Sequence, residues 1–150
     1  MKKFRACFVF DFMGDLDEEV ESAVLEINAL CGYMGRQHFP LEIVTKSQVL
    51  TPEMMKTSYD LLIIDYGGLS PGSSTGELQV NAACRYAENH PNCLVVIWTG
   101  FTSYIYEDEL EEKFGHLDNI VKRYIGGQVY ANLDGRPEFI TKFKNWFGVK

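Results

Sequence analysis

The spacing of hydrophobic residues along the chain changes repeatedly between two periods. Short runs rich in β-branched, aliphatic and aromatic residues are typical of buried strands, and they occupy residues 4–12, 41–45, 59–66, 93–99 and 119–125. Between these runs, apolar residues recur at helical intervals, which predicts helices over residues 16–30, 76–89, 106–114 and 137–147, and a short one from Thr51-Pro52-Glu53. The chain therefore alternates strands with helices.

This alternation predicts an α/β fold with a parallel sheet and right-handed crossovers. We expect one doubly wound domain spanning residues 1–150, because no repeat, low-complexity tract or linker divides the chain. Five strand–helix units suit the flavodoxin-like strand order 2-1-3-4-5, with helices on both faces of the sheet. In that topology, ligands bind at the carboxyl ends of the first and third strands.

Composition narrows the class of protein. With 46% hydrophobic and 23% charged residues, the 150-residue chain is globular, and its net charge of −7 disfavours binding to nucleic acid or to an anionic membrane. The longest apolar runs are far shorter than the roughly 20 residues of a membrane span. Its four cysteines are scattered and include no Cys-x-x-Cys pair, so we expect free thiols and a cytoplasmic protein.

The carboxyl edge of the predicted sheet gathers acidic residues. Asp11 and Asp65 end the first and third predicted strands, Asp15 follows in the loop after the first, and Thr99 ends the fourth. Two carboxylates about 4 Å apart repel by roughly 4 kcal/mol at an effective dielectric constant near 20, so such a cluster needs a cation or a raised pKa. Mg²⁺ prefers carboxylates, water and phosphate oxygens, which makes it the expected cofactor.

Three segments resemble the receiver domains of response regulators, the chemotaxis-type, flavodoxin-like phosphoacceptors of two-component signalling. They are YDLLIIDYGGLSPGSSTGELQV, HPNCLVVIWTGFTS and LCGYMGRQHFPLEIVTKS. The resemblance implies that Asp65 is the phosphoacceptor and that Thr99 carries the switch hydroxyl. It also implies that Mg²⁺ is bound by Asp11, by Asp65 and by the backbone carbonyl of Gly67.

The chain departs from the receiver pattern in three places. Phe12 follows Asp11 where receivers have a second acid, so Asp15 must substitute for it from a longer loop. The loop after Asp65 is also longer than in the family. Gly126-Gly127 stands where receivers place a Lys after the fifth strand, and Lys122 comes too early. Without that Lys the phosphoryl group lacks its main cationic partner, so a divergent or degenerate receiver is expected.

These observations predict a stand-alone signalling domain, not an enzyme. A kinase phosphorylates Asp65, or a degenerate pseudo-receiver acts by docking, in both cases through the surface from Thr99 to Glu112. The alternative is a flavodoxin-like protein that binds a small molecule or nucleotide in the loop from Gly67 to Thr75, with Ser73, Ser74 and Thr75 as a candidate phosphate cradle.

A haloacid-dehalogenase-like phosphatase with Asp11 as the nucleophile is a poorer alternative. Such enzymes need a second acid two residues after the nucleophile, and Met13 occupies that position.

Overall fold

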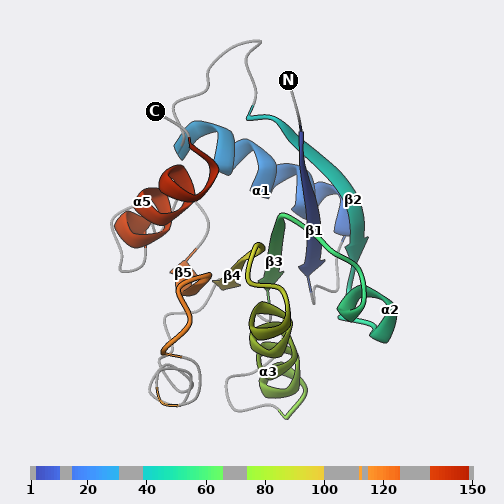
Figure 1. Cartoon of the computed structure of the whole chain (residues 1–150). Coiled ribbons are helices and arrows are strands. Elements are labelled where there is room, and N and C mark those ends of the chain that lie inside the picture. Colours follow the sequence, from blue (N-terminus) through green and yellow to red (C-terminus); the bar gives the residue numbers. More distant parts are fainter. Residues whose placement is uncertain are drawn as a thin grey trace.

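The computed structural model describes residues 3–10, 15–30, 39–65, 74–99, 112, 115–125 and 136–148. Its strands are β1 (Phe4–Phe10), β2 (Leu41–Ser47), β3 (Leu61–Asp65), β4 (Leu94–Thr99) and β5 (Ile120–Ile125). Its helices are α1 (Leu16–Leu30), α2 (Pro52–Met55), α3 (Ser74–Asn89) and α5 (Arg136–Phe147), as Figure 1 shows. Of the helix predicted over residues 106–114, only Glu112 lies among the described residues.

The strands form one sheet in the order β2-β1-β3-β4-β5, and every neighbouring pair is parallel. The predicted α/β class with a parallel sheet is therefore confirmed. The register is irregular between Ala6 and Cys7 on β1 and between Val96 and Trp98 on β4. In the described part of the chain, no helix is long and apolar enough to cross a membrane.

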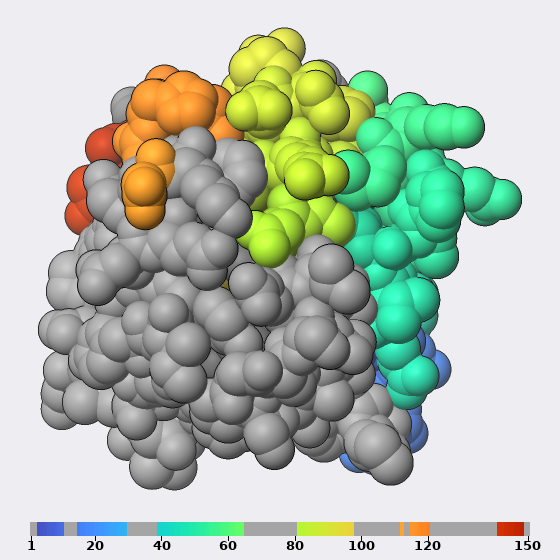
Figure 2. Space-filling view, turned by 90° about the horizontal axis from the view of Figure 1, so that it is seen from below, coloured from blue at the N-terminus to red at the C-terminus, as the bar shows by residue number. Residues whose placement is uncertain are grey.

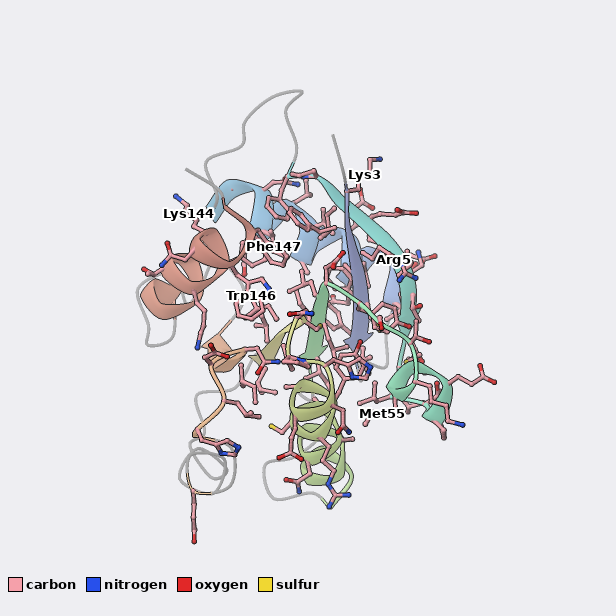
Figure 3. All side chains as sticks on the ribbon, viewed as in Figure 1. Lys3, Arg5, Met55, Lys144, Trp146 and Phe147 are labelled. Carbon is pink, nitrogen blue, oxygen red and sulfur yellow. The ribbon has the colours of Figure 1, made fainter. Side chains whose placement is uncertain are left out.

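One face of the sheet is covered by α1 and α5. Its core consists of alternate residues of the inner strands packed against one side of each helix: Ala6, Phe8, Phe10, Val20, Ala23, Ile27, Phe39, Leu61, Ile63, Leu94, Val96 and Phe143. Trp146 and Phe147 lie on the side of α5 that faces the sheet, whereas Lys144 points away (Figure 3). The aromatic C-terminal helix therefore packs into the core of its own domain.

The opposite face is covered by α2 and α3. This second core contains Cys7, Val9, Met54, Tyr59, Leu62, Ile64, Ala83, Cys84, Tyr86, Ala87, Cys93, Val95, Ile97 and Ile120. In Figure 2, residues of α3 and of the segment from β2 to α2 form neighbouring parts of the surface. Because β1, β3 and β4 are buried on both faces, they have nearly continuous apolar sequences, as expected for the inner strands of a parallel sheet.

Local sequence signals set the helix ends. The Thr51 side chain accepts a hydrogen bond from the Met54 N–H (3.3 Å), and Pro52 occupies the first position of α2, as its sequence predicted. The prediction for α3 was wrong by two positions, since the helix begins at Ser74 instead of Gly76. Ser74 and Thr75 therefore belong to the first turn of α3 and not to the preceding loop.

Candidate functional site

The strand register defines the carboxyl edge of the sheet. Asp65 is the last residue of β3, the central strand, and is in register with Phe10 of β1 and Trp98 of β4. Thr99 follows Trp98 as the last residue of β4. Neighbouring strands lie about 4.8 Å apart, so the backbones of Asp65 and Thr99 come to the same edge within one residue of each other along their strands.

The other predicted site residues are only partly described. Asp11, Gly67 and Ser73 lie outside the described residues, and Ser74 and Thr75 are placed as part of the α3 backbone. Phe10, which precedes Asp11 in the chain, is the β1 residue in register with Asp65. The roles assigned to Asp11, Asp65, Gly67 and Thr99 as metal ligands, phosphoacceptor and switch hydroxyl stay predictions.

Asp15 caps the N-terminus of α1. Its Oδ1 atom accepts hydrogen bonds from the backbone N–H groups of Asp17 (3.0 Å) and Glu18 (3.3 Å), and the side chain is exposed. These bonds satisfy two amides that have no partner within the helix. Asp15 thus has a defined structural role, whether or not it also binds a metal.

The structure also locates the lysines near β5. Thr99 is in register with Ile125, so Lys122 lies three positions before the β5 residue that aligns with the end of β4. Lys142 of α5 donates a hydrogen bond from Nζ to the carbonyl oxygen of Ile120 (3.1 Å), at the opposite end of β5. Neither backbone position matches that of the receiver Lys, which follows the fifth strand.

The side chains that the structure describes include no group of three His, Cys, Asp or Glu residues placed to hold a metal ion. The predicted ligands Asp11 and Asp65 are not among those side chains. For the surface predicted from Thr99 to Glu112, only the two terminal positions are described, and Glu112 is exposed.

The amino ends of the strands carry a polar network that the sequence did not reveal. Asn119, which is buried and precedes β5, donates from Nδ2 toward the carbonyl oxygens of Ala87 (2.9 Å), His90 (3.2 Å) and Cys93 (2.9 Å). These contacts cap the C-terminal end of α3 and join it to the start of β4. His90 also stacks on Tyr86, with ring centroids 3.9 Å apart.

Three buried thiols lie on the same face of the sheet as α3. Burial raises the pKa of Cys7 from 9.0 to about 12, against a smaller opposing effect of the hydrogen bond from Tyr59. Burial likewise raises the pKa of Cys84 from 9.0 to about 12, and it also raises the pKa of Cys93. Because the thiolate is the reactive form, these cysteines are unreactive core residues and not nucleophiles.

Comparison with known proteins agrees with this geometry at the level of the fold. The sequence matches no protein-family model and no curated protein. The structure is similar to the isolated REC domain of RcsB from Salmonella enterica serovar Typhimurium, solved in the presence of phosphomimetic BeF3−, with a TM-score of 0.55 and 13% identity over 96% of this chain and 90% of that one.

A structure of the S. typhimurium RcsB response regulator in its S207C form gives a TM-score of 0.53 and 15% identity, over 100% of this chain and 63% of that one. The chain therefore shares the fold of response-regulator receiver domains.

Proposed function

We propose that this chain is a receiver-like signalling domain in which Asp65 accepts a phosphoryl group. The observation that carries the proposal is the position of Asp65 at the carboxyl end of the central strand, in register with Phe10 and Trp98. Asp11 and Thr99 follow those two residues directly in the sequence. Three groups suited to phosphoryl chemistry are thus attached to three neighbouring strands at one edge.

The reaction is a displacement at phosphorus. A carboxylate oxygen of Asp65 attacks the phosphorus of a phosphorylated histidine or of acetyl phosphate, the bond to the leaving group breaks, and a mixed anhydride forms. The leaving group departs with the electron pair of the broken bond. The hydroxyl group of Thr99 then donates a hydrogen bond to a phosphoryl oxygen.

The proposed donor set fits Mg²⁺, because carboxylates and a backbone carbonyl are the hard oxygen ligands that this ion prefers. Asp11, Asp15, Asp65 and the carbonyl of Gly67 are the residues that would hold it. A bound Mg²⁺ supplies the positive charge that offsets the acids and the phosphoryl oxygens. Asp15 would contribute from the position just before α1, where its Oδ1 atom already accepts the two capping hydrogen bonds.

The absence of a Lys after β5 gives the proposal two forms. In the active form the phosphoryl group is held without that cation, and the mixed anhydride changes the loops after β3 and β4. In the degenerate form Asp65 is not phosphorylated, and the same surface, from Thr99 to Glu112, binds a protein partner constitutively. In both forms the output is protein docking, and the acidic charge of −7 argues against nucleic acid as the partner.

Intact-mass measurement after incubation with acetyl phosphate and Mg²⁺ tests the active form, with Asp65→Asn as the control. We expect one added phosphoryl group, absent in the control and absent when EDTA removes the metal. An adduct that persists in Asp65→Asn would overturn the assignment of the phosphoacceptor. If the folded wild-type protein carries no adduct, and none forms after incubation with a panel of histidine kinases, the active form is excluded and the degenerate form is supported.

A further inference from the structure

Strand β5 contains one residue more than β4 over the same length of the sheet. The register advances by three residues on β5, from Val121 to Tyr124, while it advances by two on β4. Lys122 and Arg123 lie between those residues, and both are opposite Ile97 of β4. An additional residue of this kind is a β-bulge, and bulges are frequent next to functional sites. The bulge therefore brings two basic residues to one position of the outermost strand, beside β4 (Figure 1).

The β5 bulge is close to the carboxyl edge of the sheet. Ile97 comes two residues before Thr99, which ends β4. The residue between them, Trp98, is in register with Asp65. Neighbouring strands lie about 4.8 Å apart and rise about 3.3 Å per residue, so the backbone at Arg123 is about 8 Å from that at Thr99 and about 10 Å from that at Asp65. A long side chain can span the diagonal distance between such positions of neighbouring strands.

The other basic residues of the described strands are engaged elsewhere. Arg5 of β1 donates a hydrogen bond from its guanidinium group to the carbonyl oxygen of Ser58 (2.6 Å), which lies before the start of β3. Lys46 Nζ of β2 lies 2.6 Å from Oδ1 of Asp17. Because β3 and β4 contain no basic residue, the remaining cations of the described strands are the two in the β5 bulge.

The proposed phosphoryl chemistry needs positive charge at this edge. A phosphoryl group on Asp65 carries close to two negative charges. Asp11 and Asp15 follow β1 in the sequence and add one negative charge each. A single Mg²⁺ offsets only half of this total, so the phosphorylated site keeps a net negative charge unless a cationic side chain reaches it.

We propose that Arg123 supplies this charge, and that its guanidinium group donates two hydrogen bonds to oxygens of the phosphoryl group on Asp65. The inference rests on the proposed function, in which the Thr99 hydroxyl group binds the same phosphoryl group, so a side chain that reaches Thr99 also reaches the phosphoryl oxygens. No proton is transferred, because arginine stays charged in proteins. The planar guanidinium group matches two phosphoryl oxygens, whereas Lys122 offers a point charge one residue farther from the edge.

The time course of adduct formation with acetyl phosphate and Mg²⁺, followed by intact mass, tests the proposal. Arg123→Met should lower the rate at least about tenfold, because it removes hydrogen-bond donors from oxygens that carry negative charge in the transition state. Arg123→Lys keeps the charge and should retain part of the rate. Lys122→Met is the matched control from the same bulge and should leave the rate nearly unchanged. Circular dichroism and thermal unfolding establish that each variant is folded.

Binding of the phosphomimetic beryllofluoride in the presence of Mg²⁺, followed by tryptophan fluorescence, gives a second measurement. Arg123→Met should bind beryllofluoride at least about tenfold more weakly than the wild type. Its affinity for Mg²⁺ alone should not fall, because removal of a nearby positive charge does not disfavour a bound cation. A general disturbance of the site would weaken both.

The outcomes separate this inference from the proposed function. If Arg123→Met equals the wild type in both measurements while Asp65→Asn forms no adduct, the role of Arg123 is wrong and the phosphoacceptor stands. If the folded wild type forms no adduct and binds no beryllofluoride, both are overturned. A larger loss of rate in Lys122→Met than in Arg123→Met would overturn the choice of Arg123.

Discussion

The hydroxyl oxygen of Tyr86 lies 2.6 Å from the backbone carbonyl oxygen of Thr57, to which it donates a hydrogen bond. The same oxygen accepts a hydrogen bond from the backbone N–H of Tyr59 (2.9 Å). One side chain of α3 therefore satisfies two backbone groups in the segment between α2 and β3. This contact fixes α3 near its C-terminal end, while its N-terminal end faces the carboxyl edge.

Replacing Tyr86 by Phe should lower the free energy of unfolding by about 1–3 kcal/mol, because it leaves the Tyr59 N–H and the Thr57 carbonyl without their partner. Urea denaturation measures this loss. Tyr59→Phe is the comparison, since the Tyr59 hydroxyl group forms a hydrogen bond with the Thr45 side chain (2.9 Å). If Tyr59→Phe loses more free energy of unfolding than Tyr86→Phe, the hydrogen bonds of Tyr86 contribute less to stability than the hydrogen bond of Tyr59.

Asp15 offers a way to separate helix capping from metal binding. Asp15→Ser keeps a capping oxygen, so stability should stay within about 0.5 kcal/mol of the wild type, whereas Asp15→Ala should lose about 0.5–2 kcal/mol. If Asp15 also binds Mg²⁺, both variants should weaken Mg²⁺ affinity, measured by titration of tryptophan fluorescence. Unchanged affinity in both variants would restrict Asp15 to its capping role.

The buried thiols predict a loss of stability in alkaline solution. Cys7 and Cys84 have pKa values raised from 9.0 to about 12, so between these limits the unfolded chain ionises and the folded one does not. The contribution of each buried thiol to stability is fully present below pH 9.0, the pKa of the thiol in the unfolded chain. It is lost as the pH rises to about 12, the pKa of the thiol in the folded protein. Each thiol should lower the free energy of unfolding by about 1.4 kcal/mol per pH unit in this window.

Denaturant unfolding at a series of pH values between 9 and 11, the lower part of that window, checks the effect. In Cys84→Ala, the free energy of unfolding should fall less steeply with pH, by the contribution of one thiol. The smaller side chain also lowers stability at neutral pH, but that loss does not change the slope. Identical slopes in the two proteins would mean that the Cys84 thiol ionises as readily in the folded state as in the unfolded one.

Lys142 makes a hydrogen bond to the first residue of the edge strand β5. Lys142→Met keeps most of the aliphatic stem but removes the bond to the Ile120 carbonyl, so a loss of about 0.5–1.5 kcal/mol is expected. Hydrogen exchange should become faster for amides of β5 and stay unchanged in β1. Lys144→Met is the matched control, because Lys144 points away from the sheet in Figure 3. If Lys142→Met and Lys144→Met change stability and hydrogen exchange equally, the hydrogen bond from Lys142 to Ile120 does not stabilise β5.

Much of the fold could be predicted because local and long-range signals agree. The prediction for α1 was correct at both ends, since the apolar spacing from Leu16 to Leu30 coincides with acids in the first turn. The start of α3 was placed too late, because Ser74 and Thr75 follow a run rich in Gly and Ser that is equally typical of a loop.

The network at the amino ends of the strands could not be predicted. Asn119 contacts residues 26 to 32 positions away, and Tyr86 contacts residues 27 to 29 positions away. No local pattern distinguishes such residues from ordinary polar positions. At the carboxyl edge, by contrast, the register of Asp65 with Phe10 and Trp98 follows from strand order and length, which the apolar runs already define.

Among the residues that the structure describes, the two cores on either side of the sheet share no side chain, because successive residues of β1, β3 and β4 point to opposite faces. Substitutions under α1 and α5 should therefore add to those under α2 and α3 with little interaction energy. During evolution each core can then accumulate and compensate replacements on its own. This independence offers one physical route by which a chain only 13% identical to the RcsB domain retains its fold.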